Sequence, residues 1–258
     1  MEYFVWSASP IAFSLGPIHV FWYGILFASS IIFGLEFMKW AFKLEKKDET
    51  AIDSLFLYAV IGIVVGARLG HCFFYEPEFY LAYPLKILAV WEGGLASHGG
   101  GLGAILALYF GTKKYKVEFL WLIDRLIIPT AFFGFLVRMG NFMNSEIVGT
   151  RTDVPWAIIF SKVDSFPRHP AQLYEAFSYL IIFFILLSIY KLSKAKVRVG
   201  LMFGLFLTLI FSARFLIEYV KVAQADYDTS FLMMSTGQAL SIPFFLVGLG
   251  FIVWSLKK

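Results

Sequence analysis

Seven apolar runs, most of them about twenty residues long, dominate the sequence and restrict what the chain can fold into. The hydrocarbon core of a bilayer is about 30 Å thick, and about 20 helical residues cross it. The chain has 258 residues, of which 59% are hydrophobic and only 16% charged, so a soluble fold is disfavoured. We predict an all-α polytopic membrane protein with about seven transmembrane helices and a single transmembrane domain over 1–258. The predicted spans are 19–38, 52–75, 97–111, 118–140, 172–190, 200–220 and 237–256.

Lysine and arginine residues gather in alternate connections between these runs. They lie within 39–47, 113–116 and 191–198, and the chain ends in Lys257 and Lys258. Cytoplasmic loops carry such an excess of basic residues. We therefore predict that these connections are cytoplasmic, with the N-terminus outside and the C-terminus inside. The same pattern accounts for the formal charge of +4 without a nucleic-acid partner.

The remaining connections, at 76–96, 141–171 and 221–236, contain fewer lysines and are predicted to face outward. The connection at 141–171 exceeds the usual loop length, and such loops are commonly functional. We expect it to form a small extracytoplasmic head. Within the second run, Gly62, Gly66 and Gly70 recur at every fourth position, which predicts close approach of another helix.

A cluster of polar residues lies at the end of the fourth run, where Arg138 is followed by Asn141, Asn144 and Glu146. An arginine at the edge of the hydrocarbon layer is costly unless it is paired or meets water or an anion. A helix end leaving the membrane would account for the arginine alone. The two amides and the carboxylate beside it indicate a functional site.

Position in a predicted span gives depth, because a helix rises about 1.5 Å per residue. Arg68, His98, Arg138 and Arg214 come from four different runs, and all are predicted to lie toward the outer face. Internal salt bridges are one way to compensate such charges. The other is a shared anionic partner, because the planar donors of arginine suit a phosphate group. Asp124 and Arg125 lie at the cytoplasmic end instead, and we interpret that pair as structural.

His98 lies in the glycine-rich stretch 97–101, where it either takes a proton near neutral pH or is satisfied by a neighbour. The four histidines lack the spacing of metal ligands, so no metal site is expected, and we predict no cofactor. No GxSxG motif occurs, and the single Cys72 lies in an apolar stretch. The chain therefore has no evident nucleophile of its own.

Six motifs follow one another along the chain: HVFWYG at 19–24, GARLG at 66–70, SHGG at 97–100, RMGNFMNSE at 138–146, RHPAQLYE at 168–175 and ARFLIE at 213–218. In this order they resemble the prolipoprotein diacylglyceryl transferases of bacterial inner membranes. Family members often carry glycine where this chain has Val137 and Ser145, which affects local backbone geometry and leaves the polar residues in place.

The resemblance implies transfer of the diacylglyceryl group of phosphatidylglycerol to the lipobox cysteine thiol of a prolipoprotein, the first step of lipoprotein maturation. It implies a multi-pass protein of the bacterial cytoplasmic (inner) membrane, with phosphatidylglycerol, a signal peptide with its lipobox, and the lipid bilayer as partners. The implied catalytic residues are His98, Arg138 and Arg214. The implied substrate-binding residues are Arg138, Asn141, Asn144, Glu146, Gly149, Tyr23, Arg68 and Glu218.

Two other classes of protein compete with this interpretation. A seven-helix transporter or binding protein for a small anion would carry buried polar residues into the cytoplasmic half of several helices. The first, third, fifth and seventh runs are nearly uncharged there, which disfavours a conduction path. A non-catalytic lipid-binding scaffold would share the same residues and differ only in the absence of turnover.

Overall fold

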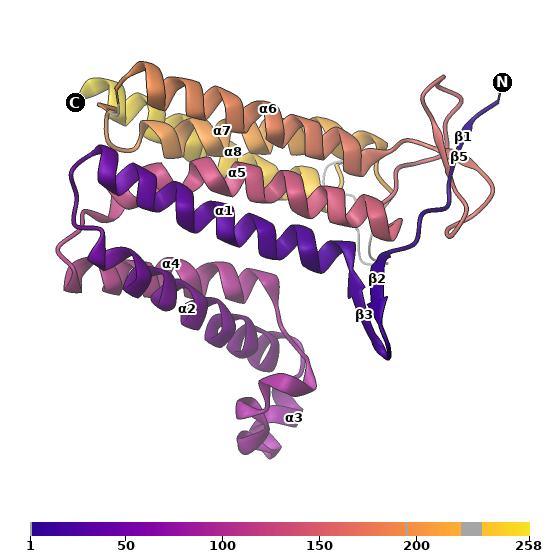
Figure 1. Cartoon of the computed structure of the whole chain (residues 1–258), viewed down its shortest axis with the longest axis horizontal. Helices are drawn as coiled ribbons and strands as arrows, with labels where there is room; N and C mark the ends of the chain where they lie inside the picture. Colours follow the sequence, from indigo (N-terminus) through magenta and orange to yellow (C-terminus); the bar gives the residue numbers. More distant parts are fainter. Residues whose placement is uncertain (1, 195, 223–233) are drawn as a thin grey trace. The chain divides into compact units, whose positions relative to one another are not determined.

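A computed structural model describes residues 2–194, 196–222 and 234–258, and the chain is mostly helical in these ranges. The predicted outward connection at 221–236 falls largely outside the described residues. The chain divides into two compact units, Met1–Phe37 with Ile123–Lys258, and Met38–Leu122. Figure 1 labels their elements.

Helices make up most of the larger unit. Phe33, Phe132 and Phe183 form an aromatic core there, with ring centroids 4.4 to 5.8 Å apart. Between the last two helices, Gly204 and Gly248 allow the backbones to approach closely. The elements of this unit are the N-terminal part of α1 (Trp22–Leu44), most of α5 (Phe119–Asn144), α6 (Ala171–Leu192), α7 (Leu201–Ile217), η3 (Glu218–Val220) and α8 (Thr236–Lys257).

Asp124 holds the start of α7. Its buried carboxylate accepts hydrogen bonds from the backbone N–H groups of Gly200 at 2.6 Å and Phe203 at 2.9 Å. The first N–H groups of a helix have no partner within the helix, so a carboxylate there satisfies them. The guanidinium of Arg125 lies 3.9 Å from the same carboxylate. The structural role predicted for this pair is confirmed.

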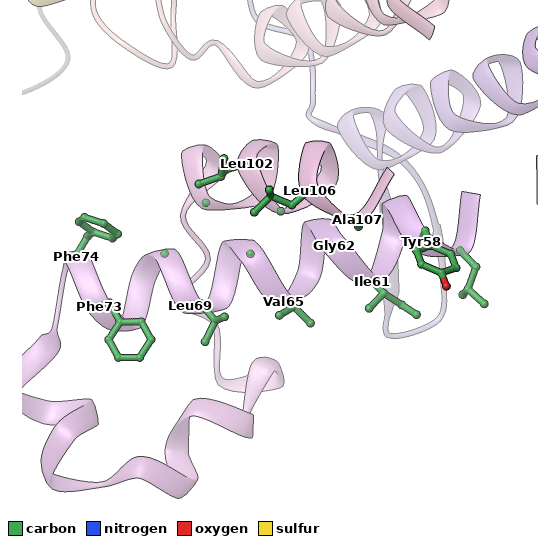
Figure 2. A pocket seen from close by; sticks show the side chains of 15 residues that line it. Tyr58, Ile61, Gly62, Val65, Leu69, Phe73, Phe74, Leu102, Leu106 and Ala107 are labelled. Carbon is green, nitrogen blue, oxygen red and sulfur yellow. The ribbon is translucent and has the colours of Figure 1, made fainter. Parts of the chain in front are cut away.

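The smaller unit pairs α2 (Thr50–Phe74) with α4 (Ser97–Lys114), linked by α3 (Pro77–Ala82), η1 (Pro84–Leu88) and η2 (Val90–Glu92). A Cβ atom on Gly66 would lie only 2.3 Å from the carbonyl oxygen of Gly99. The glycine ridge predicted within the second run is thus confirmed as a close helix contact. An apolar cavity of about 540 Å³ lies beside this contact. Figure 2 shows its lining, which includes Val65 and Phe73 from α2 and Leu102 and Leu106 from α4.

Six helices of the described residues are long and apolar enough to cross a membrane, which identifies a polytopic membrane protein. The predicted run at 97–111 does form a helix, α4, but its glycine-rich start and terminal lysines leave it outside this set. The first helix begins at Trp22 and continues to Leu44, so it includes Lys39 and Lys43 of the predicted connection. Long lysine side chains can extend from a helix end toward water.

Short strands, which the sequence analysis did not predict, accompany the helices. β1 (Phe4–Trp6) pairs in parallel with β4 (Ile158–Phe160), and β5 (Pro167–Arg168) completes a three-stranded sheet. A hairpin of β2 (Ile11–Leu15) and β3 (Ile18–Phe21) precedes α1, so the first residues of the predicted span 19–38 are strand. The connection 141–171 therefore builds its sheet with the N-terminal residues.

A small apolar core anchors this sheet to the end of α5. Phe142, Ile158 and Phe160 are buried together, and Trp6 packs against them. The indole N–H of Trp6 also donates to the carbonyl oxygen of Phe142 at 3.1 Å. The sheet consequently fixes the backbone of α5 at the turn where the predicted polar cluster lies.

Candidate active site

Arg138 forms an ion pair with Glu175 in the larger unit. Its Nε lies 2.8 Å from Oε2 of Glu175, whose side chain is only 1% exposed. Among the described residues, neither carboxylate oxygen of Glu175 receives an aligned hydrogen bond. The contact is therefore close but not linear. A buried carboxylate that is paired without aligned donors holds a cation and remains under-satisfied.

The polar residues around Arg138 form a chain of hydrogen bonds. The guanidinium donates to Oδ1 of Asn141 at 3.3 Å, and the Asn141 amide donates to the Glu146 carboxylate at 3.2 Å. The amide of Asn144 donates to the other oxygen of the same carboxylate at 3.1 Å. The structure thus brings together four predicted site residues, and Glu146 orients both amides.

Further charges lie beside this chain. The guanidinium of Arg214, on α7, is hydrogen-bonded to the phenol of Tyr179, on α6. The ammonium of Lys221 lies 3.1 Å from Glu218 and 3.7 Å from Glu175. Three cations, Arg138, Arg214 and Lys221, face two carboxylates, so these five groups carry a formal charge of +1. Glu146 adds a negative charge at the exposed edge, where water screens it.

The turn after α5 has an uncommon backbone conformation. Ser145 and Ile147 have φ angles of 58° and 57°, a left-handed region that costs roughly 1–3 kcal/mol for residues other than glycine. The N–H groups of Ser145 and Glu146 donate back to the carbonyls of Phe142 and Asn141, which closes the helix end. The side-chain amide of Gln172 donates to the carbonyl oxygen of Glu146.

Gly149 lies where three backbone segments cross. Its N–H donates to the carbonyl oxygen of His169 at 2.9 Å, and its carbonyl accepts from Arg168 at 3.1 Å. A Cβ atom would lie 2.5 Å from the His169 carbonyl oxygen and 2.6 Å from that of Val220. These contacts require glycine for packing. Substrate binding by Gly149 stays a prediction.

Burial of His169 beside this crossing lowers the pKa of its imidazole, so the neutral ring is favoured. The ring nitrogen Nδ1 lies 3.1 Å from the hydroxyl of Tyr174, and the indole of Trp156 donates to the same hydroxyl at 2.7 Å. The conformation of the turn at 169–170 is thereby tied to the first turns of α6.

The remaining candidates of the larger unit, Tyr23 and Glu218, lie close to glycines. A Cβ atom on Gly140 would lie 2.7 Å from the ring of Tyr23, so the phenol packs on α5 one residue before Asn141. A Cβ atom on Gly237 would likewise lie 2.4 Å from a carboxylate oxygen of Glu218, so this carboxylate lies against the start of α8. A helix N-terminus favours a negative charge.

Two candidates belong to the smaller unit. Arg68 is buried, and its guanidinium donates to the backbone carbonyls of Lys86, Ile87 and Gly93, so it holds the connection between α3 and α4. His98 is exposed at the second residue of α4. Both roles assigned by resemblance stay predictions. Cys72 is fully buried.

Sequence reasoning missed four residues of the cluster. Glu175 is the only acid in the fifth apolar run, and an ionisable residue inside a span is itself a signal of function. Searching the predicted spans for ionisable residues would have found Glu175. Gln172 lies in the motif at 168–175 but received no role. Tyr179 and Lys221 offered no signal, because their importance depends on contacts with residues far away in the sequence.

The apolar helices and the buried arginine–carboxylate cluster define the class: a polytopic membrane protein with a polar site suited to an anion. The family model described as prolipoprotein diacylglyceryl transferase matches residues 10–254. The chain belongs to the prolipoprotein diacylglyceryl transferase family, and it is a transferase.

Several curated relatives extend over the whole chain. The phosphatidylglycerol–prolipoprotein diacylglyceryl transferase of Tolumonas auensis is 51% identical over 98% of both chains. The protein of the same name from Chloroherpeton thalassium is 50% identical over 100% of this chain and 96% of its own length. That of Bacteroides fragilis is 41% identical over 98% and 95%, respectively.

Proposed function

We propose that this protein transfers the diacylglyceryl group of phosphatidylglycerol to the lipobox cysteine thiol of a prolipoprotein, the first step of lipoprotein maturation. The observation that carries the proposal is the gathering of three cations, Arg138, Arg214 and Lys221, around Glu175 and Glu218 at one end of the helices. A phosphodiester head group carries one negative charge. It suits this inner part of the cluster, where cations outnumber carboxylates and unpaired charge is costly, while the further carboxylate of Glu146 is exposed.

The chemistry of the transfer needs a positive site for the leaving group. The sulfur of the thiolate attacks the glycerol carbon that bears the phosphate, the carbon–oxygen bond breaks, and glycerol phosphate leaves with the electron pair. Its negative charge grows as it departs. Arg138 and Arg214 are fixed by Glu175 and Tyr179, so they meet this charge without reorganising.

The nucleophile belongs to the prolipoprotein. A free thiol has a pKa of about 8.5, so it must lose its proton to react at neutral pH. His98, exposed at the start of α4, is the candidate for accepting or orienting that proton. The cationic cluster favours the thiolate as well.

The membrane arrangement that fits this function has the N-terminus outside, the C-terminus inside and α4 as a seventh span. The cluster gathers residues from the C-terminal ends of α5 and α7 and from the start of α6. The lysines near 191–196 and at the C-terminus lie at the other ends of their helices. This separation supports a position of the cluster at the outer leaflet of a bacterial cytoplasmic (inner) membrane, where the lipobox of a signal peptide would emerge.

The test is turnover by the purified protein. We expect a lipobox peptide incubated with phosphatidylglycerol to gain the mass of a diacylglyceryl group, whereas its Cys→Ser version should not. Binding of phosphatidylglycerol by folded protein without any mass shift would instead identify a non-catalytic lipid-binding protein. Replacing phosphatidylglycerol with phosphatidylcholine, whose head group has no net charge, tests whether the charge match matters.

A further inference from the structure

We propose that Gln172 is a positioning residue for the transfer, holding the left-handed turn at 145–147 so that Glu146, Asn141 and Asn144 meet the lipid head group. The inference rests on the proposed function and adds a residue to it. Gln172 is fully buried in the first turn of α6, and its side-chain N–H donates to the carbonyl oxygen of Glu146 at 2.5 Å.

The turn needs an external tether. Ser145 lies at the position after a helix end where glycine is preferred, and Ile147 is a β-branched residue with φ 57°, which is a genuine outlier. The hydrogen bonds from Ser145 and Glu146 back to α5 fix the first of these residues. The carbonyl held by Gln172 belongs to Glu146, between the two. Its hydrogen bond is therefore suited to keeping Ile147 in its strained conformation.

The burial of Gln172 points to the same role. A carbonyl oxygen accepts only from a donor, so the amide must turn its nitrogen toward Glu146. The oxygen Oε1 is then left buried and without a partner among the described residues. An apolar side chain would avoid this unsatisfied acceptor. What the glutamine contributes is the single donor to the turn.

The turn controls the groups that reach Arg138. The Glu146 carboxylate accepts from Asn141 and Asn144, and Asn141 in turn accepts from Arg138. If the turn relaxes to a right-handed conformation, Glu146 swings away and both amides lose their orientation. The head group of the lipid would lose its partners, whereas the peptide substrate would be unaffected.

Gln172→Met tests the proposal, because methionine has a similar volume and no donor. We expect the KM for phosphatidylglycerol to rise about tenfold, the order of one lost hydrogen bond in such a network, with the KM for the lipobox peptide unchanged. In a double-mutant cycle, Ser145→Gly should reduce the rise in the lipid KM caused by Gln172→Met, because glycine adopts the left-handed conformation freely. It also removes a buried hydroxyl that has no partner among the described residues.

Ser255→Ala is the control, since Ser255 is equally buried in α8, its hydroxyl has no partner in the described part of the chain, and its loss should leave both KM values unchanged. A merely structural role for Gln172 would lower kcat through loss of folded protein and leave both KM values alone, which would overturn the inference. If Gln172→Met does not fold, Ser145→Val should raise the lipid KM selectively by straining the same turn. An unchanged lipid KM in Ser145→Val would also overturn the inference about Gln172. Lack of turnover by the unaltered protein would instead reject the proposed function.

Discussion

Arg138 and Glu175 form a buried ion pair, with Nε of the arginine 2.8 Å from Oε2 of the carboxylate. The sequence left two ways to compensate the charge of Arg138, an internal salt bridge or a bound anion, and the structure shows the salt bridge. Arg138 can still bind an anion as well, because a guanidinium has five N–H donors. Within the described residues, one of these donors bonds Asn141, and Nε lies beside Glu175 without an aligned hydrogen bond.

Glu175→Gln should lower both activity and stability. Removing one partner of a buried ion pair typically costs about 3–5 kcal/mol, and the guanidinium would lose the group that orients it. We expect a lower kcat in the peptide mass-shift assay and a lower melting temperature. Glu49→Gln removes an exposed carboxylate that caps nothing, so it serves as the control. Full activity of the Glu175 variant would contradict the role given to this pair.

Arg138→Lys should retain the charge but lose the planar set of donors. The expected fall in kcat is about 10² to 10³, comparable to losing one donor of an oxyanion hole. Arg198→Lys is the matched control, because Arg198 is exposed and donates to the backbone of Leu256 at the other end of the helices. Equal activity of the two variants would remove Arg138 from the phosphate site.

Gly149→Ala should destabilise the crossing of backbones rather than abolish chemistry directly. The new Cβ atom would be 2.5 Å from a carbonyl oxygen, so the backbone must shift, at a cost of roughly 1–3 kcal/mol. Thermal unfolding measures this. Gly250→Ala in α8, where a Cβ atom meets nothing within 4 Å, should instead leave stability unchanged or raise it. Similar melting temperatures for both variants would refute the packing argument.

The ion pair of Asp164 with Arg168 should make the connection 141–171 sensitive to acid. Hydrogen bonding to Arg168 holds the pKa of the Asp164 carboxyl below its ordinary range. A carboxyl with a lowered pKa in the folded state stabilises the fold above its unfolded pKa. That contribution is lost as the pH falls below about 4. The protection of amide hydrogens over 149–169, measured relative to their intrinsic exchange rate, should fall there, and Asp164→Asn should show the reduced protection at neutral pH as well.

His98→Asn separates proton transfer from a structural role. If His98 takes the thiol proton, the rate should fall most at acidic pH. It should recover in part as the pH approaches the thiol pKa of about 8.5, where the thiolate forms without help. The pH dependence of kcat/KM for the lipobox peptide is the measurement. A loss of equal size at every pH would indicate binding or structure.

The membrane fold could be predicted from local sequence, because inside a bilayer each backbone group must be satisfied within its own helix. Six of the seven apolar runs are helices of spanning length, and the glycine ridge of α2 packs as expected. Arg138, Asn141 and Asn144 lie three residues apart on one helix, so their grouping follows from helical geometry alone. The family was also evident from the order of its motifs.

Other features depended on residues far apart in the chain. Phe4 pairs with Ile158 in the sheet, and a strand of three residues leaves too short a pattern to reveal its partner. Glu175, Gln172 and Lys221 join the cluster only because α6 and the end of α7 bring them to the end of α5. Sequence periodicity assigns each residue to a helix and a face. The pairing of charges between helices is decided by the packing that buries them together, since a buried charge must find a partner wherever the fold provides one.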